Sequence, residues 1–323
     1  MGITDIRTTW PAWTGRAAAV WSAAYAAGAV GAALSPGRAY GYALGAKAHG
    51  TAVEWAVAGL YTAAAALGLL MLRRPGLRWA PATAWVAVAA AFVSGFGFLF
   101  SPAHLLDLVS RNQDPMDWAA WANQGVATLG AVLWTGTALA YRRRARGTCP
   151  HCGGRGHRAR AERRTRAGYV AVAALLPYAL LKSAWAAGAR VGYSGSGRHP
   201  GLDEHYAGDQ VIRLYEHGVD LTVVLALTGM ALALVLSLPR FRRLPRLPLL
   251  ALGWAGAGAF APFGAFLLVY GSLAWAGVLD AGTGGHAPWV VAVAYGGFCF
   301  YGVALGRAVL GFQRATRRTC RVC

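Results

Sequence analysis

Runs of about 20 residues with almost no charge recur along this chain, and a helix of that length crosses the hydrocarbon core of a bilayer. Only 13% of the 323 residues are charged, which is about half the share in an average soluble domain. This pattern excludes an ordinary soluble enzyme, a disordered tail and a secreted disulfide scaffold. It predicts an all-α, polytopic transmembrane helical bundle.

The same pattern predicts eight membrane-spanning helices, apolar on all sides and rich in Ala and Gly. Their expected bounds are 16–34, 51–72, 79–100, 118–141, 167–189, 219–238, 248–270 and 288–312. Trp and Tyr stand near many span ends, as in the aromatic belts of membrane proteins. We expect no cleavable signal peptide, because no short apolar core precedes a cleavage site.

The basic residues distinguish the two sides of the membrane. Eight spans put both termini on one side, and that side receives 24 of the 31 basic residues but only 2 of the 12 acidic ones. The positive-inside rule therefore predicts cytoplasmic N- and C-termini. Arginine outnumbers lysine 29 to 2, a bias typical of GC-rich bacterial genomes, so we expect a multi-pass protein of a bacterial plasma membrane.

The net charge of +19 also raises the hypothesis of nucleic-acid binding. The arginine clusters, however, lie beside span ends in short loops, where anionic lipid headgroups account for them. We expect the lipid bilayer, and no nucleic acid, as partner. The sequence identifies neither a protein partner nor a small-molecule substrate.

Three matches in the same order indicate an internal duplication. Residues 24–29 match 184–189, Glu54 matches Asp220, and the TCxxC sequence at 148–152 matches the one at 319–323. Chance similarity between Ala/Gly-rich helices is the alternative. The duplication predicts two four-helix repeats, 1–152 and 167–323, separated by a basic cytoplasmic linker at 153–166. Because each repeat has an even number of spans, the repeats would be parallel.

The two CxxC pairs are the most specific chemical signal. They supply four candidate metal ligands, Cys149, Cys152, Cys320 and Cys323. Four thiolates form the closed tetrahedral site of a structural zinc, which here would join the two helical halves. A redox-active pair and reduced thiols without a role are the alternatives, and His151 or His157 is an alternative ligand. Cys299, within the last span, is expected to be a small buried apolar residue.

Three ionisable residues are expected within or at the ends of spans, namely Lys182, Glu54 and Asp220. Charged residues in a span are costly and tend to face a bundle interior or a cavity. Glu54 and Asp220 are candidate partners of Lys182. The alternative for Lys182 is that it extends to the outer headgroups.

A polar cluster is predicted on the outer face, where residues 202–220 are expected to form a short helix leading into the sixth span. Its members are His205, Asp209, Arg213, Glu216 and His217. One hypothesis is an external metal or acid–base site. The other is a solvated helix joined by ion pairs, which we favour because no HExxH-like ligand spacing is present.

The segment Leu176–Gly188, LPYALLKSAWAAG, resembles a recurrent segment of uncharacterised actinobacterial multi-pass membrane proteins, in which Arg is common at the position of Lys182. The resemblance implies an integral membrane protein and carries over no catalytic residue.

Three function classes follow from these features. The first is a membrane scaffold, sensor or regulatory protein with the four-cysteine zinc clamp. The second is a transporter or flippase-like protein with a path between the halves lined by Lys182. The third is a membrane-embedded enzyme that uses the outer Asp and His residues, although we expect no enzyme.

Overall fold

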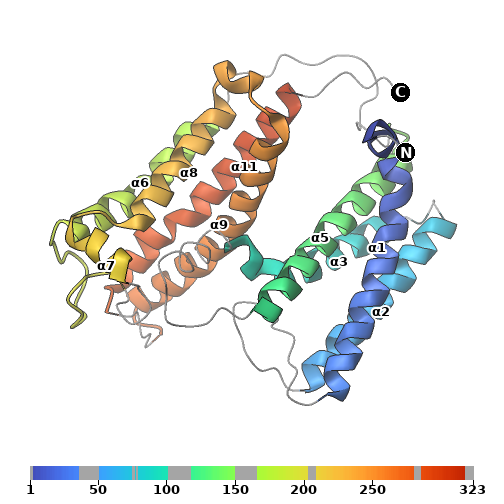
Figure 1. Ribbon diagram of the computed structural model, residues 1–323, viewed down its shortest axis with the longest axis horizontal. Helices are drawn as coiled ribbons and strands as arrows, with labels where there is room; N and C mark the ends of the chain where they lie inside the picture. The colour runs from blue at the N-terminus through green and yellow to red at the C-terminus, as the bar shows by residue number, and fades with distance from the viewer. Residues whose placement is uncertain are drawn as a thin grey trace. The chain divides into compact units, whose positions relative to one another are not determined.

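The computed structural model describes residues 3–35, 51–74, 77, 79–100, 118–149, 166–202, 209–279 and 285–316. Over these ranges the chain is helical and forms no strand, apart from an isolated β-bridge between Tyr193 and His286. The helices belong to two compact units (Figure 1). An all-α bundle with several apolar spans, predicted from the sequence, is confirmed.

The first unit contains four long helices. They are α1 (Ile3–Leu34), α2 (Thr51–Arg73), α3 (Ala80–Gly95), which the 3₁₀ turn η1 (Phe96–Phe100) continues, and α5 (Trp118–Ala145). Helix α1 packs against α2 and α5, and α3 packs against α5. Small residues allow close approach, since a Cβ atom at Gly68 would lie only 2.9 Å from that of Ala19.

The second unit contains the remaining helices. They are α6 (Ala167–Ala186), α7 (Asp209–Glu216), α8 (Leu221–Ser237), the 3₁₀ turn η2 (Pro239–Arg243), α9 (Arg246–Trp275), α10 (Pro288–Val290), the π-helical turn η3 (Val291–Tyr295) and α11 (Gly297–Ala315). Helix α11 packs against α6 and α9, and α8 packs against α6. At Gly264, a Cβ atom would overlap the backbone of Cys299.

Helices occupy all eight predicted span positions, but not all of them meet the requirements of a span. Six of the described helices are long and apolar enough to cross a membrane, or up to seven if the bent pair α7–α8 forms one span. Helix α8 is 17 residues long. Helix α5 is not among the six. Its 28 residues include Asn123, Gln124 and three arginines in the last turn, which make it more polar than the others.

The two units pair their helices in the same order. In each, the first long helix packs on the second and the fourth, and the third packs on the fourth. This shared order is what a duplicated four-helix unit would produce. The duplication and its domain boundaries stay predictions, and residues 150–165, which contain most of the expected linker, lie outside the described ranges.

Candidate functional site

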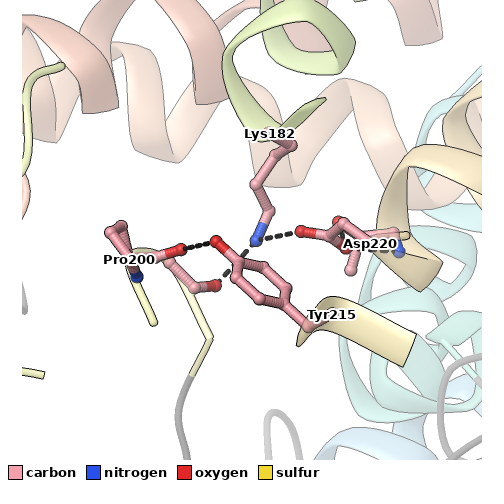
Figure 2. Close-up of polar contacts among 6 residues, drawn as sticks. Lys182, Pro200, Tyr215 and Asp220 are labelled. Atoms are coloured by element: carbon pink, nitrogen blue, oxygen red, sulfur yellow. Dashed lines mark hydrogen bonds and ion pairs between the residues drawn. The ribbon is translucent and has the colours of Figure 1, made fainter. Parts of the chain in front are cut away.

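A buried ion pair lies at the end of the second unit where α6 ends and α8 begins. Lys182, in the last turns of α6, places Nζ 3.1 Å from Oδ2 of Asp220, and the two side chains are 5% and 3% exposed. The same ammonium group donates a 2.7 Å hydrogen bond to the carbonyl oxygen of Gly201. Figure 2 shows Lys182 pointing toward Asp220, away from its helix. Because a buried charge is costly without a partner, these contacts are what allow Lys182 to be buried.

Asp220 serves α8 and Lys182 at the same time. It is the N-cap of α8, and its Oδ1 accepts hydrogen bonds from the backbone N–H and the hydroxyl of Thr222 at 2.7 and 2.6 Å. Its Oδ2 faces Lys182. The positive end of the α8 dipole also favours a carboxylate at this position. The start of α8 is therefore coupled to the charge on α6.

Gly201 brings the backbone up to the ion pair. Its φ is +71°, and a Cβ atom there would overlap the ring of Trp185 and lie 3.2 Å from Nζ of Lys182. Lys182 Nζ also lies 5.6 Å from the centroid of the Trp185 ring, within the range of a cation–π contact. Only glycine combines this backbone conformation with this close approach.

Tyr215 of α7 fixes the same turn from the other side. Its hydroxyl donates a 2.6 Å hydrogen bond to the carbonyl oxygen of Pro200, as Figure 2 shows. Burial raises the pKa of Tyr215 to about 12, and the neighbouring charge of Asp220 adds to this effect. The hydroxyl therefore remains a donor throughout the physiological pH range.

Three segments close this end of the second unit, and we call them the cover: residues 187–202, helix α7 and residues 285–287. Backbone hydrogen bonds of 2.8 Å join Ser194 N–H to Gly285 and Ala287 N–H to Gly192. Trp185 donates a 2.8 Å bond from Nε1 to the carbonyl of Val191. The cover is thus attached to the bundle by Lys182 and Trp185, while Tyr215 joins two segments of the cover, and all three residues are buried.

A short helix, α7, leads into α8 as expected, but the expectation that it extends to residue 220 is wrong, and residues 203–208 lie outside the described ranges. Helix α7 ends at Glu216, Gly218 adopts a φ of +80°, and α8 leaves at an angle of 82°. The left-handed backbone at Gly218 ends the helix. Asp220 therefore does not continue the face of α7 but begins α8.

The remaining members of the outer polar cluster do not form one site over the described residues. Glu216 Oε1 lies 3.8 Å from Nε2 of His199, and Nδ1 of His217 lies 2.7 Å from the carbonyl oxygen of Arg213. Arg213 is exposed. Asp209 begins α7, but its side chain is not described, and His205 lies outside the described residues.

Glu54 lies in the first turn of α2, in the first unit, at the position that would match Asp220 in the predicted duplication. It is only 3% exposed, and over the described part of the chain neither carboxylate oxygen has a hydrogen-bond partner. It stands on the buried stripe of α2 that continues through Ala58 and Tyr61. Unlike Asp220, Glu54 is a buried carboxylate that has no hydrogen-bond partner among the described residues.

The cysteine prediction falls mostly outside the structure. Cys152, Cys320 and Cys323 are not among the described residues, while Cys149, just after α5, has a disulfide-bonded sulfur. Within the described ranges, no three His, Cys, Asp or Glu residues could hold a metal ion together. Cys299 on α11 is a free thiol that is only half-buried, so the expectation of a buried residue is wrong.

None of the protein-family models, curated proteins or solved structures compared with this chain matches it. The class of the protein therefore rests on its own architecture, a helical bundle with several apolar spans. Sequence reasoning missed Gly201, Trp185 and Tyr215 as members of the site. The Pro200–Gly201 pair is a recognisable turn signal, but nothing in the sequence places that turn over Lys182.

Proposed function

We propose that this protein is a non-transporting scaffold or regulatory protein of a bacterial plasma membrane, with both termini in the cytoplasm. One observation carries the proposal: the Lys182 ammonium group contacts Asp220 and Gly201, so its charge holds the cover to the bundle. In this proposal the cover is a rigid surface presented at the membrane.

The energetics of the ion pair favour a fixed cover. Opening the cover would withdraw the Gly201 carbonyl from the Lys182 ammonium group, and losing a hydrogen bond to a buried charge costs about 1.5–3 kcal/mol. The three segments of the cover are also joined to one another, by the hydrogen bond from Tyr215 to Pro200 and by those between residues 192–194 and 285–287. A cover held by all of these contacts suits a permanent surface better than one that must open in every transport cycle.

Hydrogen–deuterium exchange of the full-length protein in lipid nanodiscs tests this proposal. The reporting amides are those of Ser194 and Ala287, which donate across the cover. A scaffold predicts slow exchange in a single population, and faster exchange at both amides in Lys182→Met while peptides of α9 stay unchanged. Two wild-type populations, one with both amides already exchanged, would contradict a fixed cover and favour transport.

The proposal includes a structural zinc ion held by Cys149, Cys152, Cys320 and Cys323. Two CxxC pairs are the usual ligand set for such a site. The disulfide at Cys149 is the competing state, because zinc requires the thiolate. The test is the metal content of protein purified under reducing conditions, with Cys320→Ser/Cys323→Ser as control. About one zinc per chain, lost in the variant, supports the site, whereas no zinc refutes it.

Transport is the second candidate function, and Glu54 is the observation that favours it. A buried carboxylate without hydrogen-bond partners is costly, and such residues in membrane helices mark ion or substrate pathways. Glu54 and not Lys182 would then be the residue to mutate first. We do not propose an enzyme, since the contact between His199 and Glu216 is a long one of 3.8 Å and, within the described ranges, no three His, Cys, Asp or Glu residues could hold a metal ion together.

A further inference from the structure

A groove lies at the other end of the second unit, where α6 begins and α8 ends. It has a volume of about 520 Å³ and is lined by Tyr169, Leu238, Pro239 and Arg240. Tyr169 belongs to the first turn of α6, while Pro239 and Arg240 begin η2. The groove therefore forms between two helix ends at the edge of a membrane-spanning bundle, and it has no part in the cover.

The chain segment that contains Arg240 is strongly basic. Arg240 is accompanied by Arg242, Arg243 and Arg246 within the next six residues, and no acidic residue occurs between 221 and 279. The guanidinium group of Arg240 lies 4.6 Å from the centroid of the Phe241 ring, which restricts it to one side of the turn. Arg240, Arg242 and Arg243 are all exposed, so their charges are available to an anion.

The floor and the surroundings of the groove are apolar. Leu238 and the Tyr169 ring line it, and Val170, Leu244 and Leu247 are 53%, 42% and 68% exposed nearby in sequence. Such exposed side chains on a bundle that crosses a membrane face lipid acyl chains. The first turn of α6 adds backbone N–H groups without a side-chain cap, which carry a partial positive charge.

We propose that this groove is a binding site for one anionic glycerophospholipid, whose phosphate contacts Arg240 while its glycerol and upper acyl carbons lie on Tyr169 and Leu238. Charge complementarity selects the headgroup, because a zwitterionic lipid would bring its own cation toward Arg240 and the basic segment that follows it. The apolar floor selects a lipid over a soluble phosphate. Basic pockets between membrane helices are known to hold anionic headgroups.

The test is native mass spectrometry of delipidated full-length protein titrated with phosphatidylglycerol or phosphatidylcholine. We expect the first phosphatidylglycerol to bind at least fivefold more tightly than phosphatidylcholine. Arg240→Gln should remove most of this preference, whereas Arg213→Gln, an exposed arginine on α7, should keep it. Equal binding of the two lipids to the wild type, or equal losses in both variants, would overturn the proposal.

Two further measurements distinguish a lipid site from a phosphate site and test the role of the apolar lining. Inorganic phosphate at millimolar concentration should not displace the bound lipid; displacement would mean that the site recognises phosphate alone, which overturns the lipid assignment. Tyr169→Ala keeps every arginine and should weaken phosphatidylglycerol binding by removing the apolar floor. Unchanged binding in that variant also counts against the groove. Thermal unfolding of each variant verifies that the bundle is intact.

Discussion

Trp134 of α5 donates a hydrogen bond of 3.0 Å from its indole Nε1 to the hydroxyl oxygen of Ser22 in α1, and both side chains are fully buried. With the offset of 160 residues between the matching segments, Ser22 corresponds to Lys182. The first unit thus has a neutral polar contact at the position where the second unit has a charge.

The Ser22–Trp134 contact gives the first prediction. Ser22→Ala should lower the free energy of unfolding by about 1–3 kcal/mol, because it leaves the buried indole N–H without an acceptor. The double variant Ser22→Ala/Trp134→Phe should lose less unfolding free energy than the sum of the losses in the two single variants. Denaturant titration in mild detergent measures both, and strictly additive losses would show that the hydrogen bond is unimportant.

Gly201 and Gly188 form a matched pair for the second prediction. Both have positive φ angles, +71° and +93°, but a Cβ atom at Gly201 meets Trp185, while one at Gly188 has nothing within 4 Å. Gly188→Ala should cost about 1–2 kcal/mol from backbone strain alone. Gly201→Ala should cost about 1–3 kcal/mol more from overpacking. Thermal unfolding compares them, and equal losses would contradict the close packing of the cover on Trp185.

Tyr215 predicts a pH dependence. Its pKa is raised from 10.0 to about 12 in the folded protein, so between these values the unfolded chain loses a proton that the folded protein keeps. The contribution of Tyr215 to stability is therefore complete below pH 10 and is lost as the pH rises toward 12. Unfolding measured across this window should show a shallower decline in Tyr215→Phe than in the wild type. Identical slopes would contradict a raised pKa of Tyr215 in the folded protein.

Glu54 predicts a stabilising substitution. Glu54→Gln should leave stability unchanged or raise it, because it removes a charge that has no hydrogen-bond partner in the described structure. The matched control is Glu216→Gln, whose carboxylate is exposed and which should change stability by no more than about 0.5 kcal/mol. A large loss in Glu54→Gln would show that this carboxylate is paired in the native protein.

The sequence predicts the helices well, because a membrane span is specified by local composition. For example, the predicted start at Thr51 is the observed start of α2, and the predicted span 167–189 ends within three residues of α6. The bend between α7 and α8 was not predicted. The charged residues in this segment are spaced as on a helix, and the glycine at 218, which ends α7, was not interpreted as a turn.

The charged residues of the candidate site could be predicted from the sequence, but the segments that cover them could not. Lys182 and Asp220 stand out as ionisable residues at apolar segments, and the structure brings them to 3.1 Å. The partners that enclose them come from Gly201 and Tyr215, 19 and 33 residues beyond Lys182 in sequence. Their contribution depends on how the cover folds back, which no local pattern encodes.

The central claim is that the buried pair of Lys182 and Asp220 joins α6 to α8 and positions the ammonium group that binds Gly201 of the cover, and a double-mutant cycle of the pair tests it most directly. Lys182→Met and Asp220→Asn are the suitable changes, because asparagine keeps the N-cap of α8 while removing the charge. We predict that each single variant loses about 3–5 kcal/mol of unfolding free energy. The double variant should recover at least about 2 kcal/mol of the summed loss. Additive losses in the double variant would contradict the claim.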